Sequence, residues 1–149
     1  MANRVILLDT TPLGLLTHPN PSATAIACKQ WLDLHVAQAS RVIVPEISDY
    51  ELRRELLRAN RKGGLSNLDN LIRQLEYLPL TTIAMRQAAI FWAQSRQQGQ
   101  PTAGDNTIDG DVILAAQAIT LGVPNFVIAT TNVRHLSRFV PADQWQNIT

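Results

Sequence analysis

The chain has 149 residues, of which 46% are hydrophobic and 17% charged, and its formal net charge is +1. This length suits one hydrophobic core, which typically serves about 100–200 residues, and we expect a single domain over residues 1–149. The near-neutral charge excludes a strongly basic nucleic-acid coat, and the single cysteine, Cys28, excludes an intramolecular disulfide and a cysteine-built zinc site.

The apolar runs of the chain are short. The first, Val5–Leu8, stops at Asp9, and none approaches the ~18–20 residues that a membrane helix needs. We therefore expect neither a membrane span nor a signal peptide. With one cysteine, the reducing cytoplasm is the expected compartment.

The amino-terminal half alternates apolar runs with helical periodicity. Val5–Leu8 is continuously apolar and predicts a strand. Apolar residues recur every three or four positions over residues 22–39, which predicts a helix, and a β-branched run follows at residues 41–44. Residues 48–60 carry another apolar stripe at helical spacing. The predicted order in this half is strand, helix, strand, helix.

The carboxy-terminal half continues in the same way. Helices are predicted over residues 66–75, opened by a serine cap, and over residues 82–98, which end before a glycine. Residues 77–80 form a weaker strand candidate that a proline places at a sheet edge. Residues 111–121 are apolar nearly all round and predict a buried helix, and residues 125–129 predict the last strand. This alternation predicts a helix-rich α/β sandwich with a mostly parallel sheet.

Polar side chains follow the predicted strands. Asp9 and Thr10 come directly after the first strand, Glu51 lies in the helix after the second, and Thr130 and Asn132 follow the last. Open α/β sheets bind ligands just outside the carboxyl ends of their strands. We therefore expect carboxylate, hydroxyl and amide groups to converge at one edge of the sheet.

Another acidic segment precedes the buried helix. Asp105, Asp109 and Asp111 fall within seven residues. Helix capping explains one of Asp109 and Asp111, because a helix N-terminus attracts a carboxylate. Capping does not explain several acids beside an almost wholly apolar helix.

Each acid alone has an ordinary explanation: Asp9 as a hydrogen-bond partner of a turn, Glu51 as a solvated helix residue. Together they indicate a cation site, because clustered carboxylates repel one another unless a cation lies between them. Oxygen ligands select Mg²⁺ or Mn²⁺ over zinc, and such an ion activates water for attack on a phosphodiester. The sequence therefore predicts a Mg²⁺ or Mn²⁺ site.

Other chemistries lack their motifs. The chain has no glycine-rich phosphate loop, and its histidines lack the spacing of a zinc protease. A phospho-acceptor receiver domain would need a lysine near a late strand, but the lysines are Lys29 and Lys62. Cys28 lies in an amphipathic helix and is expected to be a core thiol. The three tryptophans are expected to pack in the interior rather than to stack on bases.

Four segments resemble the PIN-domain family, and most closely the VapC-like ribonuclease toxins of bacterial toxin–antitoxin pairs. Asp9 and a hydroxyl residue end a strand as in the family's first strand. Glu51 stands before a leucine on the helix that follows a strand and a turn. Asp111 opens an Asp-x-x-Leu-Ala-Ala-x-Ala helix, and Asn132 ends a Thr-Thr-Asn turn after a strand. The resemblance spans nearly the whole chain in order.

This resemblance implies a three-layer α/β/α sandwich and a metal-dependent endoribonuclease that hydrolyses RNA, the toxin of a type II pair. It implies Asp9, Glu51 and Asp111 as catalytic metal ligands for Mg²⁺ or Mn²⁺. A small antitoxin protein and a second copy of the chain, in a homodimer, are the implied partners. Where the family has a fourth acid this chain has Asn132, so either Asn132 acts as a weaker ligand or Asp109 supplies the carboxylate.

Further residues are expected to contribute to the site. Hydroxyl and amide groups expected to support substrate or ligands are Thr10, Thr130 and Asn132. Arg54 and Arg58, four residues apart beside Glu51, are candidates for phosphate contacts. Glu55 competes with Glu51 for the glutamate position, and the following Leu52 favours Glu51.

Two other readings of the same acids stay open. A flap-like DNA nuclease would use the same carboxylates, but 149 residues leave little room for the extra helices that thread DNA. A non-catalytic PIN-like module that binds RNA or a protein is the main alternative to a ribonuclease.

Overall fold

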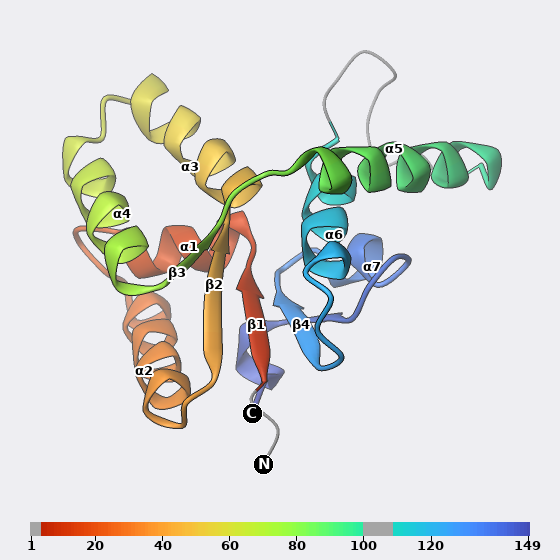
Figure 1. Ribbon diagram of the computed structural model, residues 1–149. Coiled ribbons are helices and arrows are strands. Elements are labelled where there is room, and N and C mark those ends of the chain that lie inside the picture. The colour runs from red at the N-terminus through yellow and green to blue at the C-terminus, as the bar shows by residue number, and fades with distance from the viewer. Residues whose placement is uncertain (1–3, 100–108) are drawn as a thin grey trace.

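The computed structural model describes residues 4–99 and 109–149 (Figure 1). In chain order its elements are β1 Val5–Leu8, α1 Thr10–Thr17, α2 Ala23–Ala37, β2 Arg41–Pro45, α3 Glu46–Arg58, α4 Lys62–Gln74, β3 Glu76–Leu78, α5 Thr82–Gln97, α6 Gly110–Thr120, β4 Phe126–Ala129, α7 Val133–Leu136, β5 Ala142–Asp143 and the 3₁₀ turn η1 Trp145–Asn147. Residues in helices far outnumber residues in strands, as the sequence predicts.

The strands form one sheet in the order β3-β2-β1-β4-β5, and all four pairings are parallel. β1 is the central strand, with Ile6 paired to Val42 of β2 and to Val127 of β4. β3 lies at one edge and ends before the proline at position 79, which confirms the predicted edge strand. A parallel sheet brings the carboxyl ends of β1, β2 and β4 to the same side of the molecule.

Two hydrophobic cores lie on opposite faces of the sheet. On one face, Leu7 of β1 and Ile128 of β4 pack against α5, α6 and α7. On the other, Ile6 and Leu8 of β1 pack against α1, α2, α4 and the C-terminal turn. Successive strand residues point to opposite faces, so a four-residue strand buried on both sides must be continuously apolar. The three-layer sandwich is confirmed.

Helices α3 and α6 begin at the end of the sheet where β1 and β2 finish, at the top of Figure 1. Gln117 of α6 is buried and joins three elements. Its Oε1 accepts a hydrogen bond from the backbone N–H of Ile47 (3.1 Å), and its Nε2 donates to the carbonyl of Leu78 (2.9 Å). Because no side chain caps α3 at Pro45, Gln117 supplies an acceptor for the first turn of α3 and holds α3 against α6.

The structure differs from the predicted elements at several places. The helix predicted from residue 66 begins at Lys62, so Ser66 is inside α4 and does not cap it. Gly64 lies within this helix, and a Cβ there would approach Leu56 Cδ2 of α3 to 2.9 Å, so α3 and α4 pack closely at this point. The sequence analysis also did not predict α1, α7, β5 and the 3₁₀ turn η1.

None of the helices in the described parts of the chain is long and apolar enough to cross a membrane.

Candidate active site

The polar residues after β1, β2 and β4 converge at the carboxyl end of the sheet. Asp9 follows β1, Glu51 lies one and a half turns into α3 after β2, and Thr130 follows β4. Asp111 reaches the same place from the first turn of α6. Direct hydrogen bonds and charge interactions connect these side chains, so the predicted convergence holds in the structure.

Asp9 is held by two hydrogen bonds at the start of α1. Its Oδ1 accepts from the backbone N–H of Thr10 (2.7 Å), and its Oδ2 accepts from the hydroxyl of Thr130 (2.7 Å). Thr130 is fully buried, and its Oγ1 also accepts from the backbone N–H of Asn132 (2.8 Å). These contacts fix the carboxylate while leaving lone pairs on both oxygens for a further ligand.

Glu51 is half-buried beside Asp9. Its Oε1 accepts a hydrogen bond from the hydroxyl of Thr10 (2.9 Å). Burial raises the pKa of the Glu51 carboxyl above its ordinary value, and the charges of Asp9 and Asp111 raise it further. The Thr10 hydrogen bond and the charge of Arg54 oppose this rise. The raised pKa means that burial first, and the neighbouring carboxylates second, destabilise ionised Glu51, and a bound cation would offset both effects.

Asp111 has the same kind of environment. Burial raises its pKa, and the charges of Asp9 and Asp109 add to the rise, while His135 lowers it. Its Oδ2 accepts from the side-chain amide of Asn132 (2.9 Å) and lies 3.7 Å from Nδ1 of His135. Asn132 therefore faces Asp111 as a hydrogen-bond donor.

His135 was not singled out from the sequence. It reaches Asp111 because the short helix α7 places residues 132 and 135 on one face, and the sequence analysis did not predict α7. The i, i+3 spacing from Asn132 to His135 is the signal that could have found it.

Asp109 occupies a different environment. It stands at the N-cap position of α6, but its side chain makes no capping hydrogen bond. The side chain is buried, and its Oδ2 has no hydrogen-bond partner. It lines an apolar pocket of about 280 Å³ between α5 and α6, with Met85, Trp92 and Ile113 among its neighbours. Asp105, the other acid of this segment, lies outside the described residues.

The two arginines expected to bind phosphate lie in different surroundings. The guanidinium of Arg54 lies 5.1 Å from the centre of the Tyr50 ring, and its charge lowers the pKa of Glu51, which places it beside the carboxylates. Arg58 forms an ion pair with Glu55 on the exposed surface. Glu55 therefore pairs with Arg58 rather than with the acidic cluster, and Glu51 is the glutamate beside Asp9 and Asp111.

Cys28 and two of the tryptophans are core residues away from the site. Burial raises the pKa of the Cys28 thiol to about 12, so it is a protonated core thiol at neutral pH. Trp31 and Trp145 are buried in the interior, as expected, whereas Trp92 is only partly buried, where it packs against the core.

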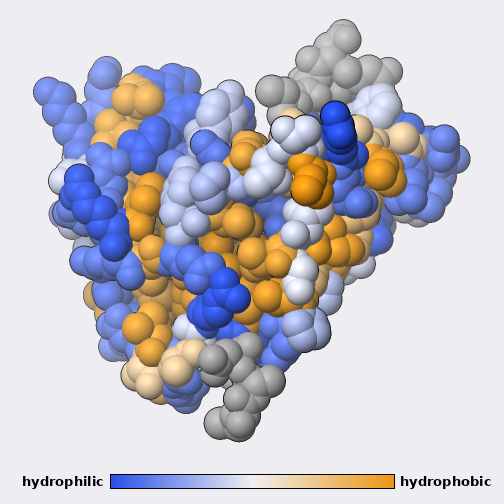
Figure 2. Space-filling view, viewed as in Figure 1, coloured by the Kyte–Doolittle hydropathy of each residue, from blue (hydrophilic) through white to orange (hydrophobic). Residues whose placement is uncertain are grey.

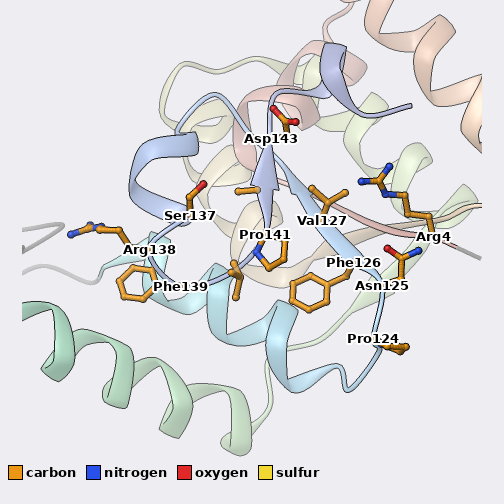
Figure 3. A pocket seen from close by; sticks show the side chains of 12 residues that line it. Arg4, Pro124, Asn125, Phe126, Val127, Ser137, Arg138, Phe139, Pro141 and Asp143 are labelled. Atoms are coloured by element: carbon orange, nitrogen blue, oxygen red, sulfur yellow. The ribbon is translucent and has the colours of Figure 1, made fainter.

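Two hollows of the described surface lie away from these carboxylates. One, of about 740 Å³, lies along β4 and β5, where Arg4 and Asn125 mark the amino ends of β1 and β4 (Figure 3). Another, of about 780 Å³, lies between α1 and the α3–α4 turn. None of Asp9, Glu51 and Asp111 lines either hollow.

The carboxylates suit a hard cation that keeps part of its water. Among residues 4–99 and 109–149, no group of three Asp, Glu, His or Cys side chains is already arranged to hold a metal ion. Asp9 nevertheless lies close enough for its charge to raise the pKa of Glu51 and of Asp111, and the charge of Asp111 also raises the pKa of Glu51. Mg²⁺ typically binds one or two carboxylates together with several waters, so a set of carboxylate oxygen donors fits it.

Comparison with known proteins identifies the family. The family model of the PIN domain matches residues 6–139, and the chain therefore belongs to the PIN domain family. No curated protein sequence matches the chain.

Solved structures share the fold. VapBC2 from Rickettsia felis, bound to a DNA fragment from its promoter, contains a chain with a TM-score of 0.74 and 18% identity, covering 95% of this chain and 98% of that chain. VapBC-1 from nontypeable Haemophilus influenzae gives a TM-score of 0.70 at 19% identity, covering 96% and 99%. DNA-bound VapBC from Salmonella typhimurium gives 0.68 at 21% identity, covering 95% and 98%. At these identities the likeness shows the fold.

Proposed function

We propose that this chain, as a single PIN domain over residues 1–149, is a Mg²⁺- or Mn²⁺-dependent endoribonuclease. The observation that carries the proposal is the meeting of Asp9, Glu51 and Asp111 at the carboxyl end of the sheet. Burial raises the pKa of both Glu51 and Asp111, and the charge of Asp9 adds to the rise. Membership of the PIN domain family supports a nuclease.

In this mechanism Asp9, Glu51 and Asp111 would hold the metal ion. When bound, the ion supplies an acidic water and stabilises negative charge on the reacting phosphate. The hydroxyls of Thr10 and Thr130 hold the carboxylates of Glu51 and Asp9 in position, so little reorganisation is needed at the moment of reaction.

Residues at the margin of the cluster would bind the substrate and orient the acids. The amide of Asn132 holds Asp111 through a hydrogen bond, which is a positioning role rather than that of a ligand. Arg54 lies beside Glu51, and we propose that it contacts an RNA phosphate. Arg58 is assigned a weaker role, because its ion pair with Glu55 must open first.

The partner we propose is a small antitoxin protein that restrains the nuclease. The structures of similar fold are of VapBC, and the sequence motifs resemble VapC-like toxins. Co-expression with a small protein encoded beside this chain, followed by an RNA cleavage assay, tests this. We expect the complex to cleave RNA more slowly than the isolated chain, and equal rates would contradict the partner assignment.

A cleavage assay on a mixed RNA pool with Mn²⁺ tests the nuclease itself. Asp9→Asn removes one charge from the site without changing the side chain's shape, and it should abolish cleavage while the protein stays folded. Asp33→Asn is the matched control, since Asp33 is an exposed acid that pairs with Lys29 away from the site. Equal cleavage by wild type and Asp9→Asn, or no cleavage by wild type, would favour a non-catalytic PIN module.

A further inference from the structure

One glycine lies directly against the candidate site. Gly110 is the first residue of α6, immediately before Asp111, and it faces the side chain of Glu51 on α3. A Cβ on Gly110 would lie 3.0 Å from Cδ of Glu51, 3.3 Å from Oε1 and nearer still to Oε2. Real Cβ atoms do not approach other atoms so closely, so any other residue here must displace the carboxylate.

The group that would give way is the carboxylate and not the backbone. All three atoms nearest to the added Cβ belong to Glu51, the far end of a flexible side chain. The fold can therefore accept alanine at position 110 at little cost, since alanine is also favoured over glycine in helices. The displacement would instead move Glu51 relative to Asp9 and Asp111.

We propose that Gly110 is a positioning residue for the metal site: its missing side chain leaves the space in which the Glu51 carboxylate joins Asp9 and Asp111. This inference rests on the proposed function, because it assumes that Glu51 is a metal ligand. The proposed role of Gly110 does not depend on the conformational freedom of glycine. Gly110 is helical and is not among the described residues with positive φ.

Gly110→Ala tests the proposal, with Mn²⁺ binding measured by calorimetry and stability by thermal melts of the metal-free protein. We expect Mn²⁺ affinity to fall by about tenfold or more, the scale seen when a ligand's orientation is lost. The melting temperature should change little. Gly14→Ala is the matched control, because a Cβ on that helical glycine would meet Leu52 at an ordinary 3.7 Å, and it should bind Mn²⁺ like wild type.

A double-variant cycle with Glu51→Ala separates displacement of the carboxylate from any general effect on the fold. With the Glu51 side chain removed, Gly110→Ala should cause no further loss of Mn²⁺ affinity and should raise the melting temperature. If Gly110→Ala unfolds the protein in both backgrounds, Glu51 is not the group it displaces and the proposal is wrong.

Two outcomes distinguish this inference from the proposed function. Wild-type Mn²⁺ affinity in Gly110→Ala, while Asp9→Asn loses binding, overturns the positioning role and leaves the metal site standing. Absence of Mn²⁺ binding by the wild type overturns the metal site, and the role of Gly110 falls with it.

Discussion

The acids at the end of the sheet differ in how their charges are balanced. Asp9 has two hydrogen-bond donors, Thr10 and Thr130, whereas Glu51 and Asp111 have raised pKa values that a cation would lower. Asp109 has a buried oxygen without a partner. These differences make the acids separable by single substitutions.

Glu51→Gln should change how stability depends on pH in the metal-free protein. Because the folded state raises the pKa of Glu51 above its ordinary value of 4.5, the folded protein keeps a proton that the unfolded chain has lost. Stability therefore falls as pH rises from that ordinary value through the raised pKa. Glutamine removes this loss, so Glu51→Gln should melt at a higher temperature than wild type at pH 7.

Thermal melts between pH 3 and pH 7 without divalent ions check this prediction. The advantage of Glu51→Gln should disappear below the ordinary pKa of a carboxyl, where both proteins are neutral at this position. Added Mn²⁺ should raise the melting temperature of wild type more than that of the variant. A variant that is less stable than wild type at pH 7 without metal would contradict the electrostatic account.

Asp109→Asn should leave Mn²⁺ binding and RNA cleavage close to wild type. The Asp109 side chain lines the apolar pocket between α5 and α6. Its charge affects the carboxylate cluster by raising the pKa of Asp111. Because Oδ2 of this buried carboxylate has no hydrogen-bond partner, removing the charge should not lower stability. Calorimetry with Mn²⁺ and the cleavage assay decide the matter: a loss as large as that of Asp9→Asn would make Asp109 the fourth ligand.

At the scale of elements, α6 connects the chemistry to the core. It carries Asp111 at its first turn and Gln117 two turns later, where the amide bridges Ile47 of α3 and Leu78 of β3. The same helix therefore places one carboxylate and fixes the helix that carries another. This explains why a polar residue stands in an otherwise apolar helix.

Gln117→Leu should destabilise the protein. Leucine has a similar volume but leaves the N–H of Ile47 and the carbonyl of Leu78 without these partners, at a cost of about 2 kcal/mol or more, since each unsatisfied buried group costs about 1–3 kcal/mol. Urea unfolding measures the loss. The surface variant Gln30→Leu on α2 is the control, and equal stability of the two variants would show that the bridge contributes nothing.

Elements with strong hydrophobic patterns could be predicted from the sequence. β1, β2 and β4 are continuous apolar runs, and α2, α5 and α6 lie within a residue or two of their predicted ends. β5 has two residues and no pattern of its own, since it exists only by pairing with β4. α1 was missed because it contains Pro12 and Gly14, although a proline in the first turn costs no hydrogen bond.

The residues that meet at the candidate site could be predicted from the sequence, but most contacts between them could not. The rule that ligands bind at the carboxyl ends of parallel strands brought Asp9, Glu51 and Asn132 together before the strand order was known. The hydrogen bond from Thr10 to Glu51, the environment of Asp109 and the approach of His135 were not predictable, because they depend on how helices cross.

At the scale of the whole molecule, α5 exposes apolar side chains on its outer side. Its inner face packs on α6 through Ala88 and Phe91, but Ile83 is 71% exposed and Ile90 is 50% exposed. These two residues are seven positions apart and so lie on the same side of the helix. Figure 2 shows hydrophobic side chains among hydrophilic ones along this helix. Exposed apolar groups gathered on one face are typical of an interaction surface.

We expect the isolated chain to be a homodimer that buries this face. The family resemblance implies a dimer, and most homo-oligomers are two-fold symmetric, so one self-complementary face suffices. Light scattering should give twice the monomer mass of 16.5 kDa.

Ile83→Glu and Ile90→Glu should each shift the protein toward monomer, because a charge buried in an apolar interface without a partner is costly. Gln30→Glu on α2 adds the same charge elsewhere and should leave the dimer intact. A wild type that remains monomeric over a wide concentration range would overturn the dimer, and a dimer unaffected by both isoleucine variants would place the interface on another face.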